Sequence, residues 1–290
     1  MKGILIVNGF LNTGKFRDIH GLLLDAARDL GIRLELRKSS GLMHRPEALR
    51  GLEADFCLFW DKDVHLARML ETAGIPVFNG ADAIEACDDK ALTWLRLADS
   101  GIPMPRTILA PLTYEGIGYT DTGFVDEAAE VLGYPMILKE LHGSFGHQVY
   151  LARERAELPG ILERIGAHPF LMQQFIASSF GRDLRVNVAG GRAVVGMLRV
   201  NEHGDFRSNI TGGGTGRPWR LTERQAELAA AACRGLGLDF GGVDLLFGPD
   251  DEPILCEVNS NPHFRSTLDA TGIDLAPFIL EHIRERLGSA

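Results

Sequence analysis

The sequence is poor in cysteine and lacks long apolar runs. Only 4 of its 290 residues are cysteines, they share no short metal-binding spacing, and a disulfide scaffold is implausible at this length. No run approaches the roughly 18 apolar residues of a membrane span. Asn8-Gly9 interrupts the first apolar run far too early for a signal peptide. We therefore expect reduced thiols and a cytoplasmic protein. The cysteines are Cys57, Cys87, Cys233 and Cys256.

Positive charge is also scarce. The chain has 30 Lys and Arg residues against 39 Asp and Glu residues, a net charge of −9. This balance argues against nucleic acid or an anionic membrane surface as a partner of the whole chain. Repeats and low-complexity tracts are absent, and a hydrophobic content of 45% is typical of globular proteins. At about 150 residues per domain, the length suggests two domains.

Strands and helices alternate in the first eighty residues. A helix from Asp18 to Leu30 and another that begins at Asp63 separate short apolar runs. Such alternation predicts a parallel sheet covered on both faces. The predicted strands are Gly3–Asn8, Ile32–Arg37, Asp55–Trp60 and Val77-Phe78.

The rhythm changes further along the chain. A further helix is predicted at Asp88–Ser100, after which several apolar runs follow one another with a single helix between them, around Glu154–Ile165. Neighbouring strands, with Gly190-Gly191 as a tight hairpin, favour an antiparallel sheet and an α+β organisation. The predicted strands are Met136–Leu141, Gln148–Ala152, Phe170–Ile176, Leu184–Ala189 and Ala193–Val200.

The segment from Gly9 to Lys15 follows a strand and matches most of a phosphate-binding P-loop. That motif requires Ser or Thr after the lysine, because the hydroxyl holds Mg²⁺. Here the next residue is Phe16, and the helix is predicted to begin only near Asp18. An ordinary strand-to-helix loop explains the glycines, and a P-loop phosphotransferase that depends on Lys15 stays an alternative.

Two carboxylates are predicted to meet on a hairpin near the C-terminus. Only turn residues lie between Gly248 and Pro253, so the flanking strands should pair antiparallel. If those two residues face each other, Asp244 faces Glu257, and Asn259 lies on the same face. The residues that then point to the core are Val243, Leu245, Cys256 and Val258.

Adjacent acids repel each other and are costly without a cation. An all-oxygen ligand set favours a hard ion, and Mg²⁺ on one or two carboxylates usually completes its shell with nucleotide phosphates. The alternative is a solvent-facing strand face that carries acids by chance.

Groups that would hold phosphate precede the hairpin. Lys139 stands in an apolar strand, where a lysine needs an anionic partner. The loop His142–His147 contains Gly143 and Gly146, whose backbone amides can approach an anion closely, although a plain hairpin explains it equally well.

Arginines gather between residues 180 and 220, where 7 Arg stand against 3 acids. Arg185 and Arg199 lie in apolar strands, which favours an anion-binding interior over a solvated face. The Gly-rich loop Thr211–Gly216 has the composition of a segment that orders over a substrate.

Together these features resemble the ATP-grasp superfamily, and most closely its RimK/LysX-like carboxylate–amine (α-L-glutamate) ligases. The ordered set of motifs covers residues 85 to 265, and the first eighty residues resemble the pre-ATP-grasp domain of that family. The motifs are Asp89-Lys90, Ile137–Gly146, Met172–Ile176, Gly181–Arg185, Phe206–Asn209, Gly242–Asp244 and Glu257–Pro262.

The resemblance implies a role for each candidate residue and a Rossmann-like domain (1–85), a central ATP-grasp subdomain (86–170) and a C-terminal subdomain (171–290). Lys90 and Lys139 would hold ATP phosphates under a lid formed by Gly143, Ser144, Phe145 and Gly146. Gln173, Gln174, Phe175 and Ile176 would form the hinge that reads adenine. Asp244, Glu257 and Asn259 would bind Mg²⁺, or Mn²⁺ in its place, and Arg185, Arg199 and Asn209 would bind the phosphoryl group and the acyl intermediate.

The resemblance further implies that ATP is cleaved to ADP and phosphate while an amide bond forms through an acyl phosphate. The expected partners are an amino acid and a carboxylate, either a small molecule or the C-terminus of a peptide or carrier protein, with the Arg-rich and Gly-rich elements favouring an acidic acyl donor. A homo-oligomer is expected, because relatives commonly form one.

Some positions depart from the family pattern. Gln173-Gln174 stands where relatives often have Gln-Glu, Ser178 where they often have a glutamate for ribose, and His263-Phe264-Arg265 where many have small residues. Nucleoside contacts and the substrate pocket therefore follow less directly than phosphate and metal contacts. Alternatives are an ATP-grasp ligase of the D-alanine type and a nucleotide-binding module without catalysis.

Overall fold

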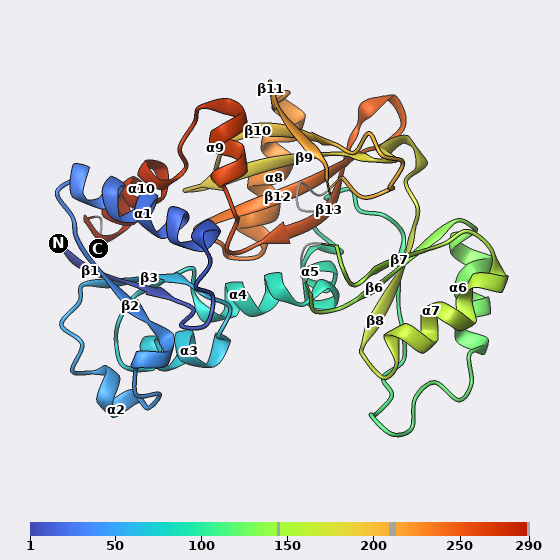
Figure 1. The fold of residues 1–290 in the computed structure, drawn as a ribbon, viewed down its shortest axis with the longest axis horizontal. Helices are drawn as coiled ribbons and strands as arrows, with labels where there is room; N and C mark the ends of the chain where they lie inside the picture. Colours follow the sequence, from blue (N-terminus) through green and yellow to red (C-terminus); the bar gives the residue numbers. More distant parts are fainter. Residues whose placement is uncertain (144–145, 209–212, 289–290) are drawn as a thin grey trace.

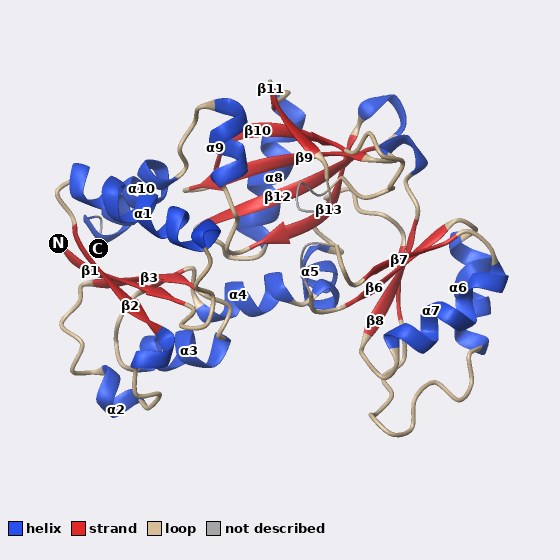
Figure 2. Cartoon of the chain, viewed as in Figure 1, coloured by secondary structure: helices blue, strands red, loops and turns tan. Residues whose placement is uncertain are grey.

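The computed structural model describes residues 1–143, 146–208 and 213–288. Three sheets organise these residues, and Figures 1 and 2 show them as an N-terminal sheet, a C-terminal sheet and a central sheet at the far end from the chain termini. The first is parallel and the other two are antiparallel, so the predicted mixture of α/β and α+β organisation is confirmed.

The N-terminal sheet has the strand order β2-β1-β3-β4. Helices α1 and α10 cover one face of it and α3 the other, so the C-terminal helix returns to the sheet where the chain begins (Figure 1). The strands are β1 (Lys2–Val7), β2 (Arg33–Lys38), β3 (Phe56–Trp60) and β4 (Val77–Phe78), and the helices are α1 (Gly14–Asp29), α2 (Pro46–Leu49), α3 (Val64–Thr72) and α10 (Ala276–Gly288).

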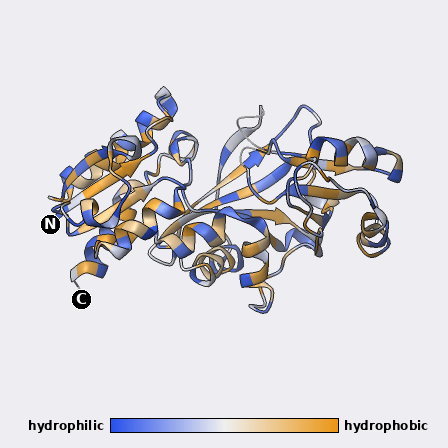
Figure 3. Ribbon diagram, turned by 90° about the horizontal axis from the view of Figure 1, so that it is seen from below, coloured by the Kyte–Doolittle hydropathy of each residue, from blue (hydrophilic) through white to orange (hydrophobic). Residues whose placement is uncertain are grey.

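Buried strand residues of this sheet alternate between two cores. Leu5 and Leu58 pack with the α1 and α10 layer, whereas Ile6 and Phe59 pack with α3. A strand buried on both faces reads as a continuous apolar run, which is why these strands were recognisable in the sequence. Figure 3 shows the hydrophobic colouring following the strands and turning hydrophilic on outer helix faces.

The central sheet has the order β5-β8-β6-β7, and α6 and α7 pack against its outer face (Figure 1). Helices α4 and α5 connect the N-terminal sheet to it. The bounds are β5 (Thr107–Leu109), β6 (Met136–Glu140), β7 (Val149–Ala152), β8 (Phe170–Gln174), α4 (Ala81–Asp88), α5 (Lys90–Leu97), α6 (Gly123–Leu132) and α7 (Leu158–Ile165).

The C-terminal sheet has the order β11-β10-β9-β12-β13, with α8 packed on one face. Thr222 begins α8 with a capping box to Gln225, and α9 contacts β10 and β11. The bounds are β9 (Arg182–Ala189), β10 (Arg192–Val200), β11 (Thr215–Trp219), β12 (Phe240–Phe247), β13 (Pro253–Asn259), α8 (Glu223–Gly235) and α9 (Arg265–Thr271).

Two predictions about helix ends were wrong. Helix α1 begins at Gly14, four residues before the predicted Asp18, with Thr13 at the cap position but without a side-chain cap hydrogen bond. Thr13 and Asp18 are both preferred capping residue types, so residue type alone does not distinguish the true start from the predicted one. The helix expected from Asp88 begins at Lys90, because Asp89 accepts hydrogen bonds from the first-turn amides.

Several short elements were not predicted: α4, α6, β11 and α9. Part of the Gly-rich segment expected as a loop over the substrate, from Thr215, forms β11, and its residues 211–212 lie outside the described residues. Within the described ranges, none of the helices is long and apolar enough to cross a membrane.

Candidate active site

A cavity of about 580 Å³ lies between the central and C-terminal sheets and extends to the N-terminal sheet. Strands β6 and β8 line one side of it, and β9, β10, β12 and β13 line the other. Its far end is lined by Asn8, Lys15 and Asp61. The volume is in the range of small-molecule sites, which span about 300–1,000 Å³.

The predicted pair of carboxylates is present on the β12–β13 hairpin. Asp244 lies opposite Glu257, and Gly242 lies opposite Asn259. All three oxygen-bearing side chains, those of Asp244, Glu257 and Asn259, line the cavity. The pairing register of the two carboxylates is therefore as the sequence predicted.

The turn of this hairpin is offset from the prediction. Phe247, rather than Gly248, lies opposite Pro253, and a β-bulge between that turn and Asp244 restores the predicted pairing of the acids. The bulge leaves Cys256 without a partner on β12.

Cys256 consequently does not point to the core, and that prediction was wrong. Its thiol lines the cavity, and Lys139 Nζ lies 3.8 Å from Cys256 Sγ. Burial raises the pKa of this thiol. The other three residues predicted to face the core are buried, namely Val243, Leu245 and Val258.

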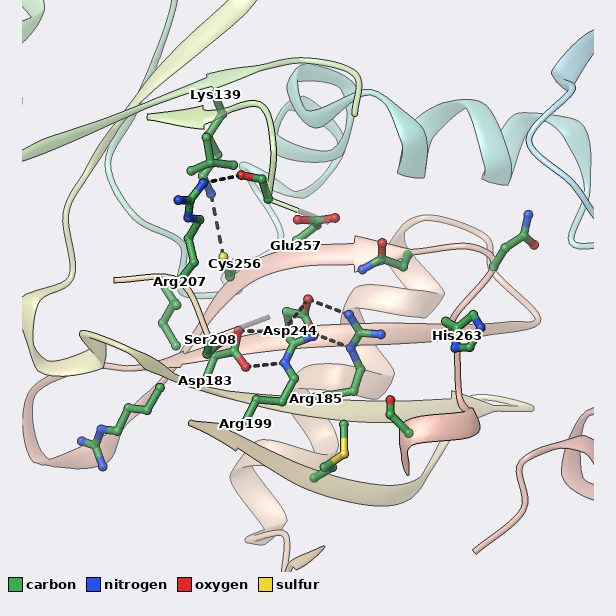
Figure 4. Close-up of a pocket in the computed structure, with 18 of the residues that line it drawn as sticks. Lys139, Asp183, Arg185, Arg199, Arg207, Ser208, Asp244, Cys256, Glu257 and His263 are labelled. Carbon is green, nitrogen blue, oxygen red and sulfur yellow. Dashed lines mark hydrogen bonds and ion pairs between the residues drawn. The ribbon is translucent and has the colours of Figure 1, made fainter. Parts of the chain in front are cut away.

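The Asp244 carboxylate is bound by two arginines, although the residue faces Glu257 across the hairpin. It lies opposite Arg185 on β9 and accepts hydrogen bonds from Arg185 Nε and, at 2.8 Å, Nη2. Arg199 Nη2 lies 2.9 Å from Asp244 Oδ2 and 2.6 Å from Asp183 Oδ2. Figure 4 shows this chain of alternating charges running across the sheet.

The charges in this chain stabilise one another. Burial alone would raise the pKa of Asp244, but the charges and hydrogen bonds of Arg185 and Arg199 outweigh it and hold the pKa below its usual value. Burial likewise opposes the charge of Arg199, and Asp183 with Asp244 raises its pKa. Asp183 was missed as a site residue, although its position two residues before Arg185 puts it on the same strand face.

Two lysines lie near Glu257 on the central-sheet side. Lys139 is buried in β6, and Lys90 opens α5 and donates to the Leu141 carbonyl at 3.1 Å. Both lysines line a smaller cavity that also contains Glu257 and Asn259. Burial lowers the pKa of Lys90, and the charge of Glu257 opposes that shift.

The predicted hinge follows the end of β8. The Gln173 amide donates to Thr107 Oγ1 at 2.9 Å, and the Gln174 backbone amide donates to the Arg106 carbonyl at 2.9 Å. The cavity is lined by all four hinge residues, Gln173, Gln174, Phe175 and Ile176.

Gly143 and Gly146 flank the predicted lid, and both have positive φ angles, 138° and 75°. Arg207 Nη1 donates to the Gly146 carbonyl at 2.9 Å and lines the cavity, a contact that sequence reasoning did not assign. Three predicted site residues lie outside the described residues: Ser144, Phe145 and Asn209.

The near-match to a P-loop lies at the other end of the cavity. Lys15 lines that end, and His263 Nε2 lies 3.2 Å from the Lys15 carbonyl oxygen. Burial, with the nearby charge of Lys15, lowers the pKa of His263 to about 4. His263 lies on the opposite side of the Arg185–Asp244 pair from Lys139 (Figure 4).

Comparison with solved structures identifies the fold. The structure of a RimK-domain ATP-grasp protein from Sphaerobacter thermophilus DSM 20745 superposes with a TM-score of 0.73 over 97% of this chain and 99% of that one, at 23% identity. The two antiparallel sheets that enclose the cavity therefore constitute an ATP-grasp fold.

Sequence comparison assigns the family. The model of the RimK-like ATP-grasp domain matches residues 87–283, and the chain belongs to this family, as the resemblance implied. β-Citrylglutamate synthase B of Danio rerio is 35% identical over 79% of this chain and 55% of its own length. N-acetylaspartylglutamate synthase A of Homo sapiens is 35% identical over 77% of this chain and 56% of its own length.

The chain thus spans little more than half the length of these two relatives. Membership of the RimK-like ATP-grasp family does not favour the alternative of a P-loop phosphotransferase, which would depend on Lys15, a residue outside the matched range.

Proposed function

We propose that this protein is an ATP-dependent carboxylate–amine ligase that releases ADP and phosphate. One observation carries the proposal: oxygen ligands from the β12–β13 hairpin, two lysines from the central subdomain and two arginines from β9 and β10 converge on connected cavities. Phosphoryl transfer needs this combination, since its catalysis consists largely of positioning and charge neutralisation.

The donor set fits Mg²⁺, with Mn²⁺ as a substitute. Asp244, Glu257 and Asn259 offer only oxygen ligands, and the Glu257 side chain makes no hydrogen bond or ion pair with any described residue. The Asn259 side-chain amide donates to the Gly242 carbonyl at 3.5 Å, which leaves its oxygen for a cation. Mg²⁺ bound there would neutralise charge on the nucleotide phosphates.

The remaining candidate residues take the roles that their positions allow. Lys90 and Lys139 bind phosphate oxygens, and the hinge Gln173–Ile176 binds adenine. Arg185 gives two of its five N–H donors to Asp244, so other donors are available for the transferred phosphoryl group. Residues 143–146 close over the phosphates, and Asn209 joins Arg185 and Arg199 at the acyl intermediate.

A carboxylate is a poor acyl donor because oxide is a poor leaving group. Transfer of the terminal phosphoryl group from ATP to a carboxylate oxygen gives an acyl phosphate and ADP. The neutral amine nitrogen then bonds to the acyl carbon, the bond from that carbon to the phosphate oxygen breaks, and phosphate leaves while the nitrogen loses one proton to water or to the phosphate. Arg185 and Arg199 stabilise the negative charge that builds up on the transferred oxygens.

The amine substrate is a glutamate-like amino acid. The names of two relatives, β-citrylglutamate synthase and N-acetylaspartylglutamate synthase, both contain glutamate in the product, which supports this assignment. The carboxylate substrate is a small molecule or the C-terminus of a peptide or carrier protein. We further propose a cytoplasmic homo-oligomer built from domains at residues 1–85, 86–170 and 171–290.

The test is a screen for ADP and phosphate release over paired carboxylates and amines, with mass detection of the amide product. We expect release that requires both an amine, L-glutamate first, and a carboxylate. Release of AMP and pyrophosphate would contradict the proposal. ATP binding without turnover for any pair would identify a nucleotide-binding module instead, and turnover with D-alanine alone would identify a D-alanine-type ligase.

A further inference from the structure

The far end of the cavity has a polar lining that the nucleotide does not explain. It is built at the carboxyl ends of β1 and β3, where Asn8 and Asp61 follow the two strands, and where open parallel sheets commonly bind ligands. The segment after β13 closes it from the other side through Asn261 and His263. His263 and the nucleotide-side Lys139 lie on opposite sides of the Arg185–Asp244 pair (Figure 4).

Two buried oxygens at this end lack a hydrogen-bond donor. Asp61 is 6% exposed, and its Oδ1 accepts from Asn8 Nδ2 at 3.1 Å and from the Lys62 amide at 2.7 Å. No residue in the described part of the chain donates to Asp61 Oδ2 or to Asn261 Oδ1. Leaving a buried acceptor without a donor costs about 1–3 kcal/mol, and more when it is charged.

The two unsatisfied oxygens belong to one local structure. Asn261 Nδ2 donates to the Asp61 backbone carbonyl at 2.6 Å, which ties the turn after β13 to the end of β3. Lys62, the adjacent cation, forms its ion pair with Asp88 rather than with Asp61. Asp61 and Asn261 line the cavity, and each keeps one buried oxygen without a donor among the described residues. Such a pair of acceptors matches a ligand with several N–H donors, and an ammonium group has three.

Cationic groups lie at the same end. Lys15 and Arg265 line the cavity, and the first turn of α1, to which Lys15 belongs, contains no acidic residue. The N-terminus of a helix favours an anion, because its first amides lack partners within the helix. The segment that resembled a P-loop thus presents a carboxylate-binding end next to the ammonium-binding oxygens.

We propose that this end of the cavity binds an α-amino acid substrate. Asp61 and Asn261 bind its amino group, and Lys15 with the first turn of α1 binds a carboxylate of it. The inference rests on the proposed ligase function and assigns its amine site. The site lies at the end of the cavity away from the phosphate-binding lysines, so the amine approaches the acyl group from that end. The bound ammonium group first gives a proton to the Asp61 carboxylate, which leaves a neutral nitrogen able to attack.

The test compares L-glutamate with glutarate, which has the same two carboxylates but no amino group. Binding is measured by calorimetry on the full chain with Mg²⁺ and a non-hydrolysable ATP analogue. We expect Asp61→Asn to weaken L-glutamate binding at least tenfold and to leave glutarate binding unchanged. Lys15→Met should weaken both ligands by similar factors, because it removes a contact to a carboxylate.

Thermal unfolding separates a binding role from a structural one. Asp61→Asn keeps an oxygen for its existing donors and removes a buried charge, so the ligand-free variant should be as stable as the wild type or more stable. Asp29→Asn, an exposed acid at the end of α1, is the matched control and should bind L-glutamate as the wild type does.

The inference is wrong if wild-type protein does not bind L-glutamate, or if Asp61→Asn binds it with unchanged affinity or loses both ligands equally. The ligase function fails separately, when no pair of substrates in the screen releases ADP. Asp61-dependent binding of L-glutamate without ADP release would leave the amino acid site in place and overturn only the reaction.

Discussion

Alanine substitutions at Asp244 and Glu257 should have the same effect on activity but different effects on stability. Both side chains are proposed ligands of one cation, so turnover should be lost in both variants. Their surroundings differ, however. Asp244 is 5% exposed and bonds to Arg185 and Arg199, whereas the Glu257 side chain bonds to no described residue.

The expected magnitude follows from what each substitution leaves behind. Without Asp244, Arg185 loses both hydrogen bonds to that carboxylate, although only 12% of its side chain is exposed in the wild type, and Arg199 keeps only Asp183. Breaking a buried ion pair by removing one partner costs about 3–5 kcal/mol. Glu257→Ala breaks no side-chain hydrogen bond or ion pair with a described residue and removes only the longer-range charge that favours ionised Lys90, so its cost should be smaller, about 1 kcal/mol.

Urea unfolding followed by circular dichroism measures the stabilities, and ADP release at saturating Mg²⁺ measures turnover. Asp244→Asn serves as a second variant, since it keeps the shape and removes the charge. Equal stability of Asp244→Ala and Glu257→Ala would refute the charge network described here. Near-normal turnover in both variants would refute the proposed cation site.

Three further predictions concern the elements around the site. Asn79→Ala should lower the free energy of unfolding by about 3–5 kcal/mol in a urea titration. The Asn79 amide is fully buried and forms four hydrogen bonds with backbone groups at the start of β12 and after β13. A decrease under about 1 kcal/mol would contradict this prediction. Gly242→Ala should destabilise the protein by about 1–3 kcal/mol and impair turnover. A Cβ at this position would meet Pro262 Cβ at 2.8 Å and Arg185 Nη1 at 3.0 Å, so the Arg185 side chain would have to move. Unchanged turnover would show that activity does not depend on the present position of this arginine. The folded-state pKa of His263, about 4, lies below its usual 6.5, so the unfolded chain binds more protons between these two pH values and the free energy of unfolding falls as the pH is lowered through them. His263→Gln should reduce this fall between pH 6.5 and 4. An identical dependence on pH in both proteins would contradict the prediction.

Strands buried on both faces and strongly signalled turns were predictable from the sequence. Strands β1 and β3 are continuous apolar runs, and the Gly-Gly hairpin at 190–191 joins β9 to β10 as expected. The opposition of Asp244 and Glu257 also followed from the turn between their strands. The turn itself is offset by one position, and the two acids still face each other only because of a β-bulge that no residue pattern predicts.

Other features depend on tertiary contacts that a single sequence does not encode locally. Thr13 at the start of α1 makes no side-chain cap hydrogen bond, and α9 is a short helix that contacts β10 and β11. The pairing of Asn261 with Asp61 joins residues 200 positions apart. Asn261 lies in the quoted motif Glu257–Pro262, but Asp61 lies in none, so their convergence at the end of the cavity emerged only from the fold.

The charges around Asp244 bear on why a cation is expected at this site. From the sequence alone, two opposed carboxylates predict a metal ion because they repel each other. In the structure Arg185 and Arg199 already neutralise Asp244, so repulsion between the acids is not what calls for a cation. Glu257 is the better reason to expect a cation, because its side chain bonds to no described residue and it lines the smaller cavity with Asn259 and the two lysines. In the proposed site a cation would compete with the arginines for Asp244, and a shift of that carboxylate toward the cation would free guanidinium donors for the proposed phosphoryl transfer. We therefore expect cation binding and the release of these arginine donors to be coupled through Asp244.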